Sequence, residues 1–138
     1  MKEYFEHEGN WTTCILKERD REFVGLALCH PEDAQFQNRI TGEHIAMSRA
    51  YIEYLTYLRN CIVSELQGIK RLYADIAQNK NFNQESFETK TILRTIKKLE
   101  IELNTVRSDI KEERENLSNF LKSKNEFYRE LEKRRGAE

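Results

Sequence analysis

Long apolar runs are missing from this 138-residue sequence, and its net charge is only −1. A membrane-spanning helix needs about eighteen or more consecutive apolar residues, so none is predicted. A chain this close to neutrality lacks the broad basic surface that general binding to nucleic acid requires. The first ten residues also carry too many charges for the apolar segment of a signal peptide. We therefore expect a cytoplasmic protein with neither a membrane nor bulk nucleic acid as its partner.

Cysteine is scarce as well, and Cys14, Cys29 and Cys61 are far apart. An odd, scattered set fits reduced thiols in a cytosolic compartment better than a disulfide framework. The plainest interpretation of each is a small buried hydrophobic residue. Charged residues are abundant, at 34% against 38% for hydrophobic ones, and this balance is typical of long solvated helices.

The first thirty residues predict a small antiparallel β-meander. Segments typical of strands span 2–8, 10–18 and 21–30, separated by the turn pair Gly9-Asn10 and the polar corner Glu18–Asp20. In the third segment both alternating sets of side chains are apolar. This pattern predicts a strand that is central or covered on both sides.

Helices are expected after residue 30, where the period of the apolar residues changes. Pro31 suits the first position of a short helix, and Glu32 and Asp33 would then lie beside its positive end. Thr41 followed by Gly42 predicts a second helix start, with Thr41 as the capping residue.

Apolar residues at seven-residue spacing form two rows along each of two long segments. In the first segment the rows are Ile45, Ile52, Leu66, Tyr73 and Leu55, Ile62, Ile69, Ile76; in the second they are Ile96, Leu103, Ile110, Leu117, Leu131 and Ile92, Leu99, Val106, Phe120, Phe127. Arg59, Glu113 and Lys124 interrupt the rows. Two such stripes joined by a short loop predict an antiparallel helical hairpin.

The predicted fold class is therefore α+β, as one domain over residues 1–138. A small N-terminal antiparallel β-meander at 1–30 precedes a long antiparallel helical hairpin, made of a helical segment at 31–77, a loop at 78–88 and a long helix at 89–134. That long helix reaches beyond what a thirty-residue sheet can cover. Because apolar surface is left over, we expect a homo-oligomer, either a dimer or an assembly of dimers.

The stretch from Cys29 to Asp33 combines a thiol, an imidazole and two carboxylates. A thiol nucleophile needs a base that converges on it from another element, whereas neighbouring residues on a strand point to opposite faces. The spacing of Cys29, His30 and Asp33 also matches no common zinc motif. We predict that this stretch joins a strand to a helix, and that the protein has no catalytic residue, no metal site and no cofactor.

The loop sequence NKNFNQESF, residues 79–87, has a different chemistry. Phe82 and Phe87 lie among amides, with Lys80 and Lys90 close by. Aromatic rings, amides and cations are what a nucleobase and its phosphates require, namely stacking, edge hydrogen bonds and charge. An equally good interpretation is that Phe82 caps the core of the hairpin.

A family resemblance gives the loop a more specific meaning. The run Gly25-x-Ala27-x-Cys29-His30-Pro31-x-Asp33-x-x-Phe36, then Gly42-x-x-Ile45-Ala46-x-x-Arg49-Ala50, looks like a pattern of small phage-encoded proteins that joins a β-hairpin to a helix. Together with the helical hairpin, it resembles the first type of phage Thoeris anti-defence protein. The resemblance implies a sponge, not an enzyme, that acts in the host cytoplasm. Such proteins bind cyclic ADP-ribose isomers made by bacterial TIR-domain enzymes, and some bind small cyclic oligonucleotides, without cleaving them and at sites between subunits.

The chemistry of the loop and of α2 then provides candidate residues for binding such a ligand. Phe82 would stack on the base, Asn81 or Asn83 would read its edge, and Phe87 would add a second ring. The phosphates would be held by Lys90, Arg94 and Arg107. Two other functions stay open: a helical protein-interaction module or inhibitor that docks on a host protein, and a small hydrolase or metal-dependent enzyme that uses His30 and Asp33.

Overall fold

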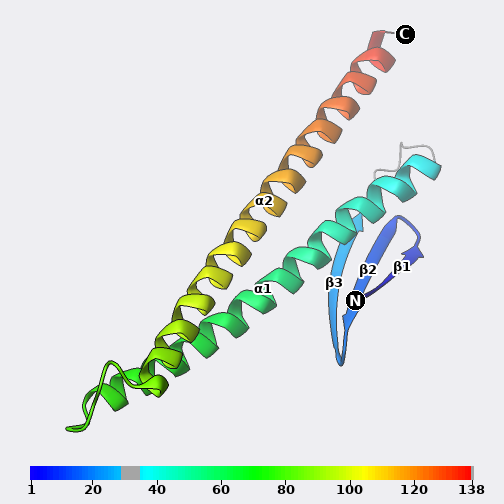
Figure 1. Cartoon of the computed structure of the whole chain (residues 1–138). Coiled ribbons are helices and arrows are strands. Elements are labelled where there is room, and N and C mark those ends of the chain that lie inside the picture. Colours follow the sequence, from blue (N-terminus) through cyan, green and yellow to red (C-terminus); the bar gives the residue numbers. More distant parts are fainter. Residues whose placement is uncertain (29–34, 138) are drawn as a thin grey trace. The chain divides into compact units, whose positions relative to one another are not determined.

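The computed structural model of the protein describes residues 1–28 and 35–137, and it confirms the predicted α+β fold (Figure 1). Three strands, β1 (Lys2–Glu8), β2 (Trp11–Glu18) and β3 (Arg21–Leu28), precede two long helices, α1 (Gln35–Ala77) and α2 (Phe87–Ala137). The chain folds as two compact units. The first unit contains Met1–Tyr54 and Ile110–Glu138, and the second contains Leu55–Asp109. Each helix therefore contributes to both units.

The sheet belongs to the first unit and is the predicted antiparallel meander, with strand order β1-β2-β3. The register leaves two residues in each turn, at the positions predicted. Each turn contains one residue with left-handed backbone geometry, Gly9 with φ 59° and Arg19 with φ 53°. Glycine adopts this conformation without steric cost, whereas an arginine does so only under the constraint of the turn.

The two faces of the sheet differ in what covers them. The inner face packs on α1 and carries the buried residues Thr12, Cys14, Leu16, Phe23 and Ala27. The outer face carries Tyr4, Trp11, Val24, Leu26 and Leu28, which are 45–60% exposed. The prediction that the third strand is central or covered on both sides is therefore wrong for the described chain, because β3 is an edge strand with one exposed face. Residue patterning shows that both faces are apolar, but not what covers them.

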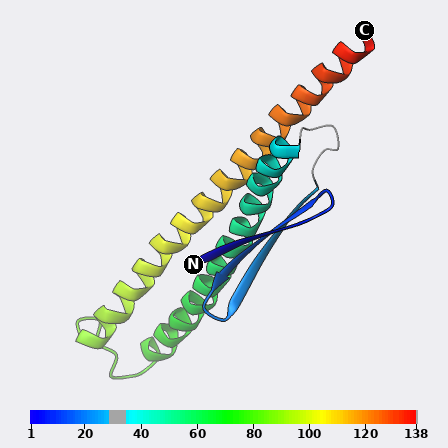
Figure 2. The same ribbon diagram turned by 90° about the vertical axis from the view of Figure 1, so that its right-hand side faces the viewer.

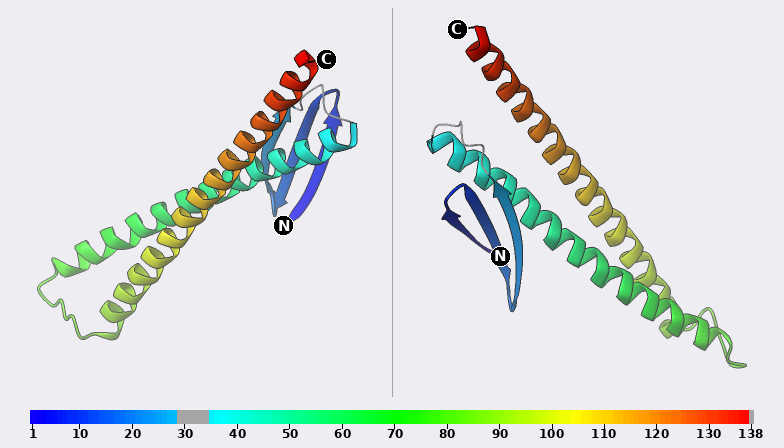
Figure 3. Two further views of the ribbon diagram at one scale, coloured as in Figure 1. Left: turned by 90° about the horizontal axis from the view of Figure 1, so that it is seen from above. Right: turned by 180° about the vertical axis from the view of Figure 1, so that it is seen from behind.

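Helix α1 approaches the inner face closely because the residues at the contact are small. A Cβ at Gly25 of β3 would collide with the carbonyl oxygen of Ala46 and the backbone nitrogen of Ala50. Both alanines are fully buried. Beside them, Arg49 donates a hydrogen bond from Nη1 to the carbonyl oxygen of Leu26 at 2.6 Å. Within the first unit, α1 lies between the sheet and α2 (Figures 2 and 3).

The predicted second helix start at Thr41 is wrong, since α1 runs without a break from Gln35 to Ala77. Thr41 is buried inside the helix and is not a cap. A glycine in a helix interior costs only about 1 kcal/mol relative to alanine, and the packing of the next turns of α1 on the sheet offsets this cost. The short helix predicted from Pro31 lies outside the described residues.

The second unit is a helical hairpin with a leucine core. Leu66 from α1 and Leu99 and Leu103 from α2 are at most 7% exposed. Partly buried residues packed against them are Ile62, Val63, Ile69 and Ile96. All of these except Val63 belong to the predicted seven-residue rows, so the rows do meet across the hairpin.

Helix α2 begins at Phe87, two residues before the predicted start, because Ser86 caps it. The Ser86 Oγ accepts a hydrogen bond from the Thr89 N–H at 3.2 Å, which satisfies one of the unpaired N–H groups at the helix start. The helix ends at Ala137, three residues beyond the predicted end. None of the described helical segments combines the length and the apolarity needed to cross a membrane.

Candidate functional site

The loop predicted to bind a ligand uses several of its polar groups to form its own turns. The Asn83 Oδ1 accepts a hydrogen bond from the Glu85 N–H at 3.0 Å, and the Asn81 N–H donates to a side-chain amide two residues earlier at 3.1 Å. Phe82 is half-buried, and its ring meets Tyr73 of α1 edge to face, with 6.0 Å between centroids. Phe82 thus contacts the end of the hairpin core, as the alternative interpretation of this residue requires.

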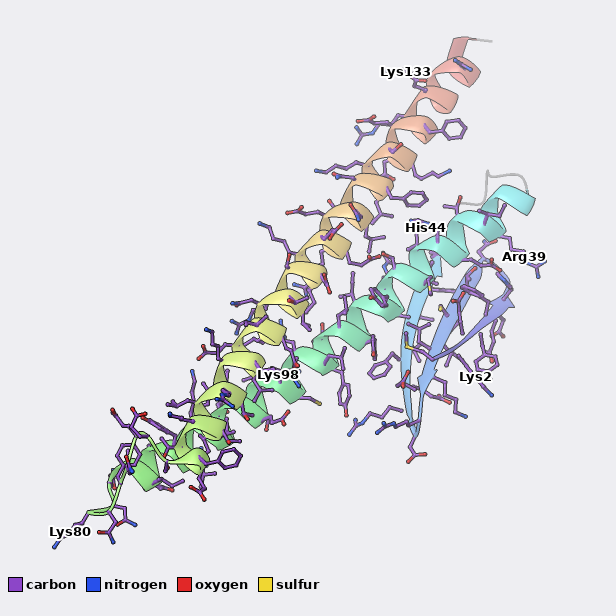
Figure 4. All side chains as sticks on the ribbon, in the orientation of Figure 1. Lys2, Arg39, His44, Lys80, Lys98 and Lys133 are labelled. Atoms are coloured by element: carbon purple, nitrogen blue, oxygen red, sulfur yellow. The ribbon has the colours of Figure 1, made fainter. Side chains whose placement is uncertain are left out.

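Three of the predicted ligand residues share one face of α2, because Phe87, Lys90 and Arg94 are spaced three and four residues apart. The Phe87 side chain is 75% exposed, and the Lys90 Nζ is 3.0 Å from the Glu85 carboxylate. At about 1.5 Å of rise per residue, Arg107 is roughly 30 Å from Phe87 along the helix. One chain therefore does not bring Arg107 to the loop. Lys80, labelled in Figure 4, projects from the outermost part of this loop.

Cys29, His30 and Asp33, whose chemistry the sequence singled out, lie outside the described residues. Among the residues that the structure does describe, no group of three or more His, Cys, Asp or Glu side chains is placed to hold a metal ion.

A cleft of about 260 Å³ lies between α1 and α2 in the first unit. It is lined by His44, Met47, Ser48 and Tyr51 of α1 and by Glu113 of α2. Met47 and Ser48 each lie three or four residues from both His44 and Tyr51, so the four α1 residues share one face of that helix. We refer to this feature as the Glu113 cleft; Figure 4 labels His44 on its α1 side.

The polar part of the Glu113 cleft is a hydrogen bond between a hydroxyl and a carboxylate. The Ser48 Oγ donates to the Glu113 Oε1 at 2.6 Å. Ser48 is only 5% exposed, and a buried hydroxyl needs such a partner. A carboxylate accepts several hydrogen bonds, so Glu113 can also receive donors from a ligand. Because the Ser48 proton points to a carboxylate, the pair does not have the geometry of a serine activated by histidine.

Aromatic rings extend from the cleft along α2. The ring of His44 lies against that of Phe120, with 4.1 Å between centroids and 30° between planes. The Lys124 Nζ lies 5.7 Å from the Phe120 centroid and 6.0 Å from that of Phe127, both within the range of cation–π attraction. A positive charge is therefore held beside the ring that His44 contacts.

The Glu113 cleft was not among the sites predicted from the sequence, although one signal for it was present. Glu113 and Lys124 are the polar residues that interrupt the apolar rows of α2. A charged residue inside a packing row must find a polar partner on the facing helix, because burial without one is costly. Only the register of the two helices identifies Ser48 as that partner.

Comparison with known proteins gives neither the loop nor the Glu113 cleft a function. No family model, no curated protein sequence and no solved structure matches this chain.

Proposed function

We propose that the protein binds a cyclic nucleotide signal of the cyclic ADP-ribose type and sequesters it without cleaving it, which blocks antiviral signalling in the host cytoplasm. The resemblance of residues 25–50 to the first type of phage Thoeris anti-defence protein supports the ligand class. The Glu113 cleft is the observation that carries the proposal. Its aromatic rings, its carboxylate and the nearby ammonium group of Lys124 are the groups that a base, a ribose and a phosphate require.

Each part of the nucleotide has a matching feature in the first unit. The rings of His44 and Tyr51 offer apolar faces to a base. The Glu113 carboxylate accepts hydrogen bonds from ribose hydroxyls or an exocyclic amine. Lys124 supplies positive charge for phosphate oxygens. These groups bind the nucleotide without breaking any of its bonds, so the site needs no nucleophile.

The volume of the cleft limits how much of the ligand enters it. Pockets that enclose whole drug-sized ligands measure about 300–1,000 Å³, and the Glu113 cleft measures about 260 Å³. It accommodates one nucleoside half, and the rest of a cyclic ADP-ribose isomer lies across the surface towards Lys124.

The loop of the second unit is a separate candidate for the same function. Phe87 offers an exposed ring, and Lys90 and Arg94 lie on the same face of α2. The Asn83 side-chain oxygen is already used in a turn and has less to offer a base edge, whereas Asn81 uses only its backbone N–H. We therefore rank the loop behind the Glu113 cleft.

Titration calorimetry with purified cyclic ADP-ribose isomers and cyclic trinucleotides tests the proposal directly. We expect binding with at least one of them, and recovery of the unchanged ligand by chromatography after heat denaturation of the complex. No heat with any of these nucleotides contradicts sequestration. Recovery of a linear product contradicts binding without cleavage.

Matched variants then separate the two candidate sites. Glu113→Gln removes a charge-assisted acceptor, so we expect affinity to fall roughly ten- to hundredfold. Glu115→Gln makes the same change at an exposed position of the same helix, and should leave affinity unchanged. If Phe82→Ala and Phe87→Ala weaken binding while Glu113→Gln does not, the ligand site is the loop.

The protein-interaction module remains the alternative function, and one observation favours it. Phe87 and Ile101 of the second unit are 75% and 59% exposed and lie fourteen residues apart, so they share one face of α2 on which a partner could dock. This alternative expects no nucleotide binding, and it expects Ile101→Asp to abolish function in infected cells while the fold is preserved.

A further inference from the structure

Helix α2 carries a cluster of positive charge in the second unit. Between Glu88 and Glu100 the sequence contains four basic residues and no acidic one, although the whole chain carries a net charge of −1. At about 100° of rotation per residue, these four and Phe87 lie within roughly a third of the helix circumference. We refer to the five residues as the α2 basic face; they are Phe87, Lys90, Arg94, Lys97 and Lys98, all exposed. Figure 4 labels Lys98.

Two of the four cations have carboxylate neighbours, but only in exposed pairs. The Lys90 Nζ is 3.0 Å from the Glu85 carboxylate, and the Lys98 Nζ is 4.0 Å from that of Glu102. Exposed ion pairs contribute little stability, because water and salt screen them. Both lysines can therefore exchange these carboxylates for another anion at little cost.

The other two cations, Arg94 and Lys97, have no ion-pair partner among residues 1–28 and 35–137. Arg94 lies four residues from both Lys90 and Lys98 and three residues from Lys97. Like charges at these spacings destabilise a helix. The cluster thus gives the fold no stability of its own, and an anion bound across the face relieves the repulsion.

We propose that a single strand of nucleic acid binds along the α2 basic face, with its phosphates on the cations and a base stacked on Phe87. Lys90, Arg94 and Lys98 repeat every four residues, which is about 6 Å along the helix axis. A line of cations matches a chain of phosphates better than it matches one compact anion. Surfaces that bind single strands combine such cations with exposed rings, because every base has a face on which a ring can stack.

The exposed ring favours a single strand over other anionic partners. Phe87 is 75% exposed and lies in line with Arg94 and Lys98. In a duplex the bases stack on one another, so a surface ring finds no free base. A helix that lies on a membrane needs a broad apolar face, whereas the apolar Leu99 and Leu103 of α2 are buried in the hairpin core. An acidic peptide such as polyglutamate matches the charges but leaves Phe87 in water.

The number of cations sets the expected strength of binding. Each phosphate contact on a single strand contributes about −0.7 to the slope of log K against log salt concentration. Two unpaired cations and two that exchange a carboxylate therefore predict a slope of about −1.5 to −3. We expect a dissociation constant of roughly 1–100 μM at physiological salt, which is the range of sequence-independent binding.

Fluorescence anisotropy with a labelled oligothymidylate of about 12 nucleotides tests the proposal. We expect saturable binding with the salt slope given above, and at least tenfold weaker binding of a duplex of the same length. No binding overturns the proposal. Equal affinity for the duplex, for phosphatidylserine vesicles or for polyglutamate overturns it too, because charge alone would then explain the binding. A polynucleotide is a different ligand from a cyclic nucleotide, so failure of the cyclic nucleotides in calorimetry does not decide this outcome.

A matched pair of charge reversals locates the site. Arg94 and Arg114 are both exposed on α2, and at about 1.5 Å of rise per residue they are roughly 30 Å apart, well beyond the Debye length. Arg94→Glu should weaken binding at least tenfold, and Arg114→Glu less than threefold. Arg94→Glu also places a carboxylate four residues from two lysines, so the helix should be kept, as circular dichroism can verify. Equal losses in the two variants overturn the assignment to the α2 basic face.

Substitutions of the ring test the stacking contact separately from the charges. Phe87→Leu keeps an apolar side chain but removes the ring, so we expect binding at least fivefold weaker. Phe87→Trp keeps a ring and should bind at least as tightly as the wild type. Leu93→Ala is the control, because Leu93 is 42% exposed on another side of α2, and it should leave affinity unchanged. If Phe87→Leu binds as tightly as the wild type, no base stacks on this ring and the proposal is wrong.

Discussion

At the scale of single residues, Gly25 sets how closely α1 can approach the sheet. We predict that Gly25→Ala destabilises the protein by more than about 3 kcal/mol, because the new methyl group meets backbone atoms of Ala46 and Ala50 that cannot rotate away. The control is Gly68→Ala, where a Cβ meets nothing within 4 Å. In this helical position alanine should stabilise by about 0.5–1 kcal/mol. Urea denaturation of both variants measures the difference, and equal effects would contradict the close packing.

Cys14 is the residue whose reactivity the structure defines best. Burial, assisted by the carboxylates of Glu3 and Glu43, raises the pKa of its thiol from 9.0 to about 11. At pH 8 we expect iodoacetamide to alkylate the exposed Cys61 and to leave Cys14 unmodified until the protein is denatured. Mass spectrometry of tryptic peptides checks this prediction. Equal rates at the two cysteines would show that Cys14 is not buried.

The same raised pKa predicts a loss of stability in alkaline solution. Below pH 9 the Cys14 thiol is protonated in both the folded and the unfolded chain, so its burial stabilises in full. Between pH 9 and 11 only the unfolded chain releases this proton, so the free energy of unfolding falls as the pH rises. Cys14→Ala should remove this part of the pH dependence. Thermal melts of both proteins at several pH values measure the difference, and parallel curves would contradict the prediction.

At this scale, the sequence correctly predicted the features that depend only on residues adjacent in the chain. It placed the turn at Gly9 and the polar corner that ends in Asp20, because these residues form turns locally. It did not find the Glu113 cleft, because the Ser48–Glu113 hydrogen bond joins residues 65 positions apart. The role of Phe82 was left open between base stacking and core packing, and its edge-to-face contact with Tyr73 is compatible with both, because the ring stays half-buried.

At the scale of the elements, the start of α2 depends on one side chain. Ser86→Ala removes the hydroxyl that accepts the Thr89 N–H, so we predict a loss of about 1 kcal/mol in stability. Ser108→Ala is the control, because Ser108 is an exposed residue in the middle of the same helix. At position 108, alanine should be neutral or slightly stabilising. Chemical denaturation followed by circular dichroism measures both, and a neutral Ser86→Ala would mean that the cap is dispensable.

The strands and helices can be predicted from the sequence because their residue patterns are regular and extend over long segments. Strand-like segments bounded by turn residues predicted all three strands, and seven-residue rows predicted both helices. The errors lie where a local signal competes with packing. Thr41 and Gly42 look like a helix start, yet contacts of Ala46 and Ala50 with β3 keep α1 continuous through them. The edge position of β3 depends on the order of strands in space, which residue alternation does not encode.

At the scale of the whole molecule, the two units differ in their apolar cores. The first unit holds a sheet packed on a helix, whereas the buried apolar side chains described in the second are Leu55, Leu66, Leu99 and Leu103. We predict that backbone amides of the second unit, near Leu66 and Leu99, exchange with deuterium faster than those of β2 and of α1 near Ala46. Hydrogen exchange followed by mass spectrometry tests this order. Uniform protection along both helices would mean that the chain opens as one cooperative body.

The hydrogen bond from Arg49 to the Leu26 carbonyl affects whether other chains can add to the edge of the sheet at high protein concentration. An edge strand with unpaired carbonyl groups is a template on which other chains add strands and grow into cross-β aggregates. Because the Arg49 guanidinium occupies a carbonyl in the middle of β3, an incoming strand would lose pairing there and meet a positive charge. At the Leu26 position, therefore, the edge of this apolar strand is already occupied and does not accept the backbone of a further strand.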